Sequence, residues 1–85
     1  MLSLFPNPTN GALTIKIALT NEEDVEAKIE VLNLLGQIII SEKETLDEGK
    51  LQKEIQLRDA AAVGMYMVKV TMGNQVYTSQ FNFQK

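Results

Sequence analysis

The chain has 85 residues and a formal net charge of −3, and it contains neither cysteine nor histidine. This length predicts one domain. Without these two residue types the sequence can form no disulfide, no zinc–thiolate site and no Ser-His-Asp or Cys-His catalytic arrangement. The acidic balance, with Arg58 as the only arginine, argues against nucleic-acid binding, because phosphate recognition depends on clustered basic side chains.

The sequence shows no targeting or membrane-spanning segment. No apolar run approaches the roughly 20 residues that a membrane helix needs. The first residues, Met1–Leu4, have no basic region and run directly into prolines, so no signal peptide is predicted. We therefore expect either a cytosolic protein or a piece of a longer protein.

The most distinctive stretch is Phe5–Gly11, in which Pro6 and Pro8 bracket Asn7. Proline fixes φ, lacks a backbone N–H and favours an extended conformation in the residue before it. Gly11 can take the positive φ that a sharp bend requires. This stretch therefore predicts a stiff, non-helical bend just before a strand.

Two segments with strand periodicity follow this bend. Apolar side chains alternate with polar ones over residues 13–19 and 25–31, which predicts two half-buried antiparallel strands. The polar residues 21–24 between them predict a turn, and its acidic residues Glu22, Glu23 and Asp24 lack the further oxygen ligands of a calcium site. The expected inward-facing residues are Leu13, Ile15, Ile17, Leu19, Val25, Ala27, Ile29 and Val31, with Glu26, Lys28 and Glu30 outward.

The middle of the chain predicts two more strands. A tight turn at Leu35–Gly36 leads into a strand over Gln37–Glu42. A loop over residues 45–50 contains the turn residues Asp47–Gly49, and residues 51–57 form the next strand, in which Lys53 interrupts the apolar face. Residues 58–63 hold three alanines and predict a crossing loop or a single helical turn.

The last two strands are joined by Gly73–Asn74, a two-residue hairpin loop with glycine first. Leu2 and Leu4 predict a short edge strand at the other end of the chain. The total of about seven strands, with turn signals every 8–12 residues or so, predicts an all-β antiparallel sandwich, immunoglobulin-like in general form. The inward residues of the last hairpin are Tyr66, Val68, Val70 and Met72, then Tyr77, Ser79, Phe81 and Phe83.

Three landmarks in this order carry a resemblance to a known family. They are Pro6-Asn7-Pro8 with Gly11, the strand that ends in the turn at Gly36, and Gly64-Met65-Tyr66. Over Phe5–Lys85 they resemble the C-terminal sorting domain of the type IX secretion system, type A. The chain departs from the family pattern in its last strand, where Gln80 and Gln84 stand in a region that commonly carries lysine or arginine.

The resemblance implies a non-catalytic secretion signal that directs a cargo protein across the outer membrane of Bacteroidota-type bacteria. Residues 1–85 would be a single C-terminal sorting domain, a fragment of a longer exported protein. Its partners would be the type IX outer-membrane translocon, a shuttle protein, a sortase that usually cleaves the domain off, and the N-terminal cargo in cis. It would pass through the periplasm to the cell surface or the medium, with no cofactor, metal, nucleic acid or small-molecule substrate.

The resemblance also implies two groups of site residues. The first group, which is recognised by the machinery or holds the fold, is Pro6, Asn7, Pro8, Gly11, Gly36, Gly64 and Tyr66. The tyrosine is expected to bury its ring while its hydroxyl finds a backbone partner. The second group is a candidate translocon-recognition strand, whose backbone would add to a partner's sheet if it lies at an edge. This strand carries Phe81, Phe83 and Lys85.

Two other functions remain open from the residues alone. The first is a fibronectin type III-like surface-binding or spacer module, which would need an exposed aromatic platform or variable loops. The chain has only five aromatic residues, mostly at strand positions. The second is a small cytosolic enzyme, which the absence of histidine and cysteine disfavours.

Overall fold

All regular structure in the described part of the chain is β-strand. The computed structural model describes residues 2–19, 25–57 and 62–84. Within these ranges no helix is long and apolar enough to cross a membrane. The seven strands are β1 (Leu2–Phe5), β2 (Ala12–Ala18), β3 (Glu26–Asn33), β4 (Ile38–Thr45), β5 (Lys50–Gln56), β6 (Gly64–Met72) and β7 (Gln75–Phe83).

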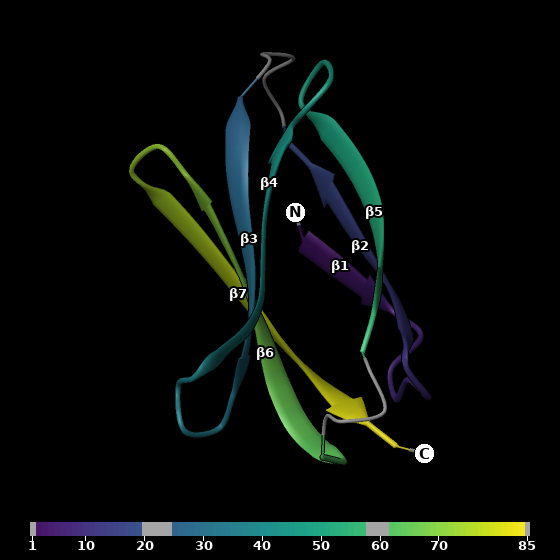
Figure 1. Ribbon diagram of the computed structural model, residues 1–85. Helices are drawn as coiled ribbons and strands as arrows, with labels where there is room; N and C mark the ends of the chain where they lie inside the picture. Colours follow the sequence, from purple (N-terminus) through teal and green to yellow (C-terminus); the bar gives the residue numbers. More distant parts are fainter. Residues whose placement is uncertain (1, 20–24, 58–61, 85) are drawn as a thin grey trace.

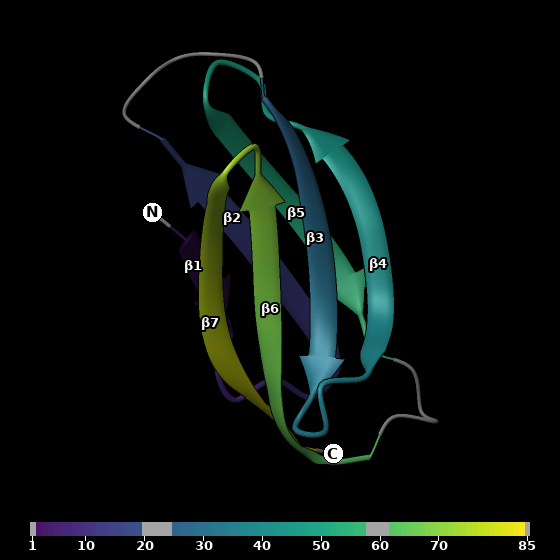
Figure 2. The same ribbon diagram turned by 90° about the vertical axis from the view of Figure 1, so that its left-hand side faces the viewer.

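The strands form two antiparallel sheets that pack face to face (Figure 1). One sheet has the order β1-β2-β5 and the other has the order β4-β3-β6-β7. Figure 2 shows the four-stranded sheet in front, with β7 at one edge and β4 at the other. The predicted all-β antiparallel sandwich of seven strands is therefore confirmed.

The core lies between the sheets and follows the period-2 pattern of the sequence. Successive side chains of a strand point to opposite faces, so every second residue of β2, β3 and β6 is buried. Leu46 and Leu57 extend the core just outside the strands, and Leu19, Val25 and Tyr77 are only partly buried. The buried apolar residues are Leu13, Ile15, Ile17, Ala27, Ile29, Val31, Leu46, Ile55, Leu57, Tyr66, Val68, Val70, Met72, Phe81 and Phe83.

Strand β4 is longer than the sequence indicated. It runs through the charged residues 42–44 to Thr45, because β3 pairs with it as far as Glu26. The predicted turn before β5 is confirmed, and the backbones of Asp47 and Lys50 close it with hydrogen bonds of 2.9 and 3.0 Å. The predicted polar turn at 21–24 and most of the predicted crossing segment at 58–63 lie outside the described residues.

Lys53, which interrupts the apolar pattern of β5, is explained by partners in the opposite sheet. Its Nζ lies 2.8 Å from Glu44 Oε1 and 3.5 Å from Glu42 Oε2, both on β4. The hydrogen bond with Glu44 and the negative charge of Glu42 raise the pKa of Lys53 above its ordinary value of 10.5. This cluster of charges links the β4 edge of one sheet to the β5 edge of the other.

Glu30 is a second departure from the simple alternation. It lies on the outer face of the four-stranded sheet, as expected, yet only 7% of the residue is exposed. Ser41 of β4 and Lys69 of β6 flank it on both sides, and Lys28 Nζ lies 3.8 Å from its Oε2. Central strands are covered by their neighbours even on an outer face, so the alternation alone overestimated the exposure of Glu30.

Candidate functional site

The loop between β1 and β2 lies against the end of β7, so the first and last described parts of the chain meet (Figure 1, lower right). The Thr9 N–H donates to the Asn82 carbonyl at 2.9 Å, and the Gln84 N–H donates to the Thr9 carbonyl at 2.8 Å. The Asn82 N–H donates to Asn7 Oδ1 at 3.0 Å. The Phe5–Pro6 and Asn7–Pro8 peptide bonds are both cis. The Pro-Asn-Pro bend thus pairs with the outer edge of the last strand.

Thr9 is the centre of this loop and was not identified from the sequence. The residue is only 1% exposed. Its Oγ1 donates to the Ala12 carbonyl and accepts the Gly11 N–H at 3.1 Å. A Ser or Thr side chain commonly forms a turn by hydrogen-bonding the backbone two residues further on. The Thr-Asn-Gly sequence could therefore have predicted this turn.

Gly11 joins the loop to the core. Its φ is +137°, which confirms the predicted use of a positive φ at this bend. The Leu57 N–H donates to the Gly11 carbonyl at 2.8 Å. A Cβ at this position would lie 3.6 Å from the Leu57 carbonyl oxygen and 3.9 Å from the Phe83 ring, which are ordinary contacts. The backbone conformation, and not the lack of space, therefore requires glycine here.

An aromatic cluster of Tyr66, Phe81 and Phe83 lies beneath this loop. The Tyr66 ring stacks on Phe81 with centroids 5.8 Å apart and meets Phe83 edge to face at 6.2 Å. The Tyr66 hydroxyl donates to the Ala62 carbonyl, so the tyrosine finds the expected backbone partner. Gly64 pairs with Phe83 across the β6–β7 ladder. Gly64 and Tyr66 therefore stand beside the same end of β7 as the Pro-Asn-Pro loop.

The structure gathers most, but not all, of the sequence-predicted site residues. Gly36 lies apart, in the β3–β4 hairpin, where its φ is +81°. Lys85 lies outside the described residues. The side chains of Phe81 and Phe83 are buried in the core, so in the folded domain these two side chains are not accessible to a partner. The residues brought together are Asn7, Gly11, Gly64, Tyr66, Phe81 and Phe83.

The outer edge of β7 is divided into a paired part and an open part. The N–H and C=O of Asn82 point away from β6 and toward the loop. Because backbone groups alternate direction along a strand, those of Thr78 and Gln80 point the same way. β7 is an edge strand, and within the described residues no further strand pairs with it there (Figure 2). The open edge therefore covers Val76–Gln80.

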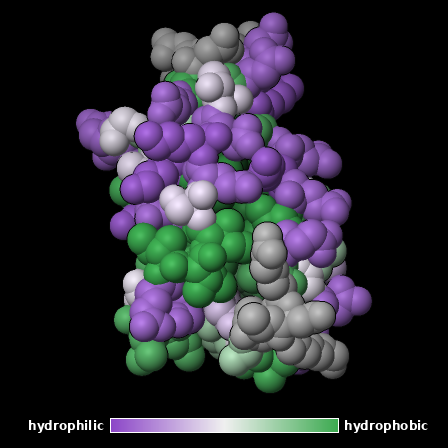
Figure 3. Space-filling view, viewed as in Figure 1, coloured by the Kyte–Doolittle hydropathy of each residue, from purple (hydrophilic) through white to green (hydrophobic). Residues whose placement is uncertain are grey.

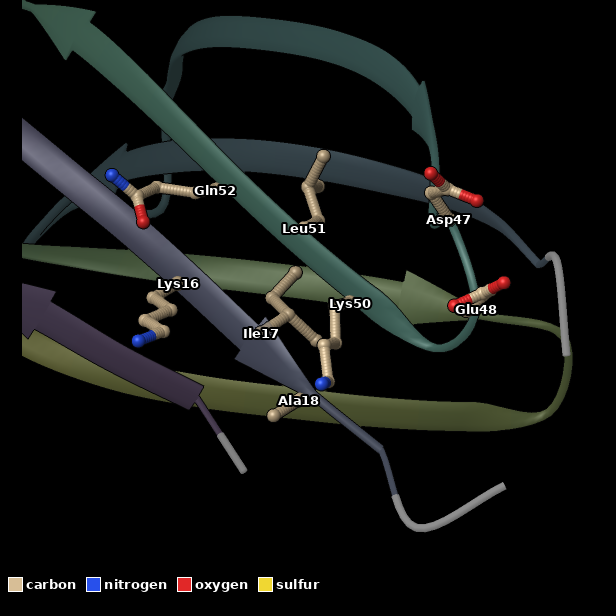
Figure 4. Close-up of a pocket in the computed structure, with 8 residues that line it drawn as sticks. All are labelled: Lys16, Ile17, Ala18, Asp47, Glu48, Lys50, Leu51 and Gln52. Carbon is tan, nitrogen blue, oxygen red and sulfur yellow. The ribbon is translucent and has the colours of Figure 1, made fainter. Parts of the chain in front are cut away.

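The surface depression in Figure 4 contains no arrangement of residues that suggests catalysis. It measures about 610 Å³ and lies at the charged end of β2 and β5, away from the Pro-Asn-Pro loop. Lys16 lies at the opposite side of the depression from Asp47 and Glu48. In the described ranges no three metal-binding side chains of the Asp, Glu, His or Cys types gather into a group. The depression carries none of the predicted site residues.

Replacing Thr9 by valine is expected to lower the free energy of unfolding by about 1–3 kcal/mol. Valine keeps the buried shape of the side chain but leaves the Ala12 carbonyl and the Gly11 N–H without their partner. Urea unfolding followed by circular dichroism measures the change. Thr78→Val, at an exposed position of β7, is the matched control and is expected to change stability by less than about 0.5 kcal/mol. Equal stability of the two variants would contradict a structural role for the Thr9 hydroxyl.

The comparison with known proteins identifies the family. A family model described as "Secretion system C-terminal sorting domain" matches residues 3–84. No curated protein sequence matches the chain. The match spans almost the whole chain and confirms the resemblance that the Pro-Asn-Pro, Gly36 and Gly64-Met65-Tyr66 landmarks indicated. Such a signal implies export across the outer membrane to the cell surface or the medium. The chain belongs to the family of C-terminal sorting domains of the type IX secretion system.

Proposed function

We propose that this domain is the non-catalytic address of a cargo protein joined to its N-terminal side. The cargo passes through the periplasm, the outer-membrane translocon and its shuttle protein read the folded domain, and a sortase then removes it. The family supports the general role of a sorting signal. Residues that precede Leu2 would join β1 at the end that pairs with Ile17, the opposite end of this strand from the Pro-Asn-Pro loop.

The open edge of β7 is the observation that carries the mechanism. An edge strand presents unpaired N–H and C=O groups to which a partner strand can add. Asn7 and Thr9 already occupy the edge at Asn82 and Gln84. A partner strand would therefore pair with Val76–Gln80, and the Pro-Asn-Pro loop would mark the point where its pairing ends.

A fibronectin type III-like binding module is not favoured by the surface of this domain. Both kinds of domain share a sandwich architecture, so the fold alone does not distinguish them. Phe5 is the one exposed aromatic residue in the described ranges, while Tyr66, Phe81 and Phe83 are buried. The surface described here thus lacks the aromatic platform that a carbohydrate-binding module would use.

Replacing Gln80 by proline is expected to reduce export of a fused reporter about tenfold, the effect of losing roughly 1.4 kcal/mol of binding. Proline removes an N–H that faces away from β6 and blocks strand addition, yet it leaves the β6–β7 ladder intact. The measurement is the fraction of a C-terminally fused reporter found outside cells of a type IX-competent host. Thermal unfolding of the purified variants verifies that they are folded.

Ser41→Pro is the matched control, since Ser41 lies on the opposite edge of the same sheet. The Leu46 N–H donates to the Val25 carbonyl, so even-numbered residues of β4 face β3 and Ser41 faces away. This variant should be exported like the wild type. Normal export of a folded Gln80→Pro variant would contradict recognition through the β7 edge.

A further inference from the structure

The β3–β4 hairpin holds two leucines in solvent on a well-braced turn. Leu34 and Leu35 are 76% and 83% exposed. Asn33 organises the turn, because its Oδ1 accepts the N–H groups of Leu35 at 3.0 Å and Gln37 at 2.9 Å. The Asn33 carbonyl also accepts the Gly36 N–H at 3.0 Å. The polar groups of the turn are thus used to fix its shape, and the two largest apolar side chains are left facing water.

Other exposed apolar side chains gather at the same end of the four-stranded sheet. Within the described ranges, six of the eight exposed large hydrophobic residues are at this end; the other two are Phe5 and Val76. Figure 3 shows this concentration as green atoms over the start of β4 and the β3–β4 hairpin. We call it the leucine end, which comprises Leu34, Leu35, Ile38, Ile39, Val63 and Met65.

The leucine end is also free of charge in the described part of the chain. The segments that form it, residues 32–41 and 62–68, contain no Asp, Glu, Lys or Arg. The charged residues of β3 and β4 lie toward the other end of the same strands, at Glu26–Glu30 and Glu42–Glu44. A complementary partner surface must therefore be apolar and uncharged, since any charge buried against this end would lack a counter-charge.

We propose that the leucine end docks into an uncharged apolar pocket on a protein component of the type IX machinery, as a contact separate from the β7 edge. This inference rests on the proposed sorting function. Contiguous exposed apolar surface on a small domain commonly marks an interaction site. Any cargo joined upstream attaches at the Leu2 end of β1, which pairs with Ile17 near the charged end of the sandwich, so the leucine end is left facing outward.

The shape and charge of the domain favour a protein pocket over a second copy or a lipid surface. The molecule measures 37 × 22 × 16 Å, so its end face is smaller than the roughly 800 Å² that each partner buries in a standard interface. A concave pocket can surround the projecting hairpin, whereas a second flat end cannot. The net charge of −3 and the absence of basic or Trp side chains in residues 32–41 and 62–68 disfavour an interfacial lipid site.

The test is export of a reporter fused to the Leu34→Ser/Leu35→Ser variant in a type IX-competent host. We expect export to fall at least about tenfold, because the free energy of burying one leucine side chain in the partner's pocket is lost. The thermal midpoint should stay that of the wild type, because both side chains are exposed. Phe5→Ser, which removes a side chain that is 44% exposed on the three-stranded sheet, outside both the leucine end and the β7 edge, is the control and should be exported normally. If the double variant unfolds, Leu35→Ser alone takes its place.

The possible results separate this inference from the sorting function itself. Export of the wild-type fusion tests the sorting function, and a difference between the leucine variant and the Phe5→Ser variant tests the docking site. Wild-type export by a folded leucine variant, or an equal loss of export with Phe5→Ser, would overturn the inference. Two further results would also overturn it, because they would assign the leucine end to another partner. One is binding of the wild-type domain to phosphatidylethanolamine–phosphatidylglycerol vesicles that the leucine variant does not show. The other is a wild-type dimer in sedimentation that the leucine variant does not form.

Discussion

Replacing Phe83 by alanine is expected to lower the free energy of unfolding by about 3–5 kcal/mol. The Phe83 side chain is buried, packs edge to face on Tyr66 and lies beside Gly11, so its removal opens a cavity where the loop, β6 and β7 meet. A domain of this size has a total stability of roughly 4–13 kcal/mol, so a large share of it would be lost. Urea unfolding measured by circular dichroism gives the change.

Phe5→Ala is the matched control for this substitution. Phe5 ends β1 and is 44% exposed, so the same chemical change should cost less than about 1.5 kcal/mol. Similar losses in the two variants would show that the aromatic cluster beneath the Pro-Asn-Pro loop is not a centre of stability. A small loss for Phe83→Ala alone would lead to the same conclusion.

Deleting residues 82–85 is expected to abolish cooperative unfolding of the domain. The deletion removes Phe83 from the core and leaves the Thr9 N–H and C=O and Asn7 Oδ1 without their partners in Asn82 and Gln84. The loss of the buried Phe83 side chain and of these hydrogen bonds together costs about 5 kcal/mol or more. This destabilisation is as large as the lower values of the free energy of unfolding for a domain of this size. Thermal unfolding followed by circular dichroism checks this expectation.

Deletion of Lys85 alone is the control for the truncation. It keeps all contacts described for residues 2–84, so a cooperative transition near that of the wild type is expected. It also separates any contribution of Lys85 to export from the folding of the domain. A wild-type midpoint after removal of residues 82–85 would contradict the expected role of the β7 end.

Because truncation is expected to unfold the domain, loss of export by a truncated chain does not measure recognition. Gln80→Pro, which keeps the β6–β7 ladder, is therefore the sharper variant.

The strands were predictable because the signal that forms them is local. Leu13, Ile15 and Ile17 alternate with polar residues, and the alternation alone assigns them to the core face. The Gly73–Asn74 turn was likewise predictable from the local sequence, and Gly73 has the expected positive φ of +60°. Lys53 was seen only as an interruption, because its partners Glu42 and Glu44 come from the other sheet.

The candidate site was predictable in its parts but not in its assembly. The two prolines indicated a stiff bend, yet Asn7 and its partner Asn82 lie 75 residues apart, and no pattern in either segment indicates the other. The burial of Thr9 depends on the same long-range pairing between the loop and the end of the chain. The exposure of Leu34 and Leu35 could not be predicted from the sequence either, because leucines beside a strand are ordinarily expected to be buried.

The central claim is that this chain is a type IX sorting signal, and one measurement tests it most directly. The chain is fused to the C-terminus of a periplasmic reporter that has its own signal peptide, and the reporter is located in a type IX-competent host and in the same host without its translocon. We predict reporter at the cell surface or in the medium of the competent host, and reporter retained in the periplasm of the other. Retention in both hosts, with the fused domain folded, would contradict the claim.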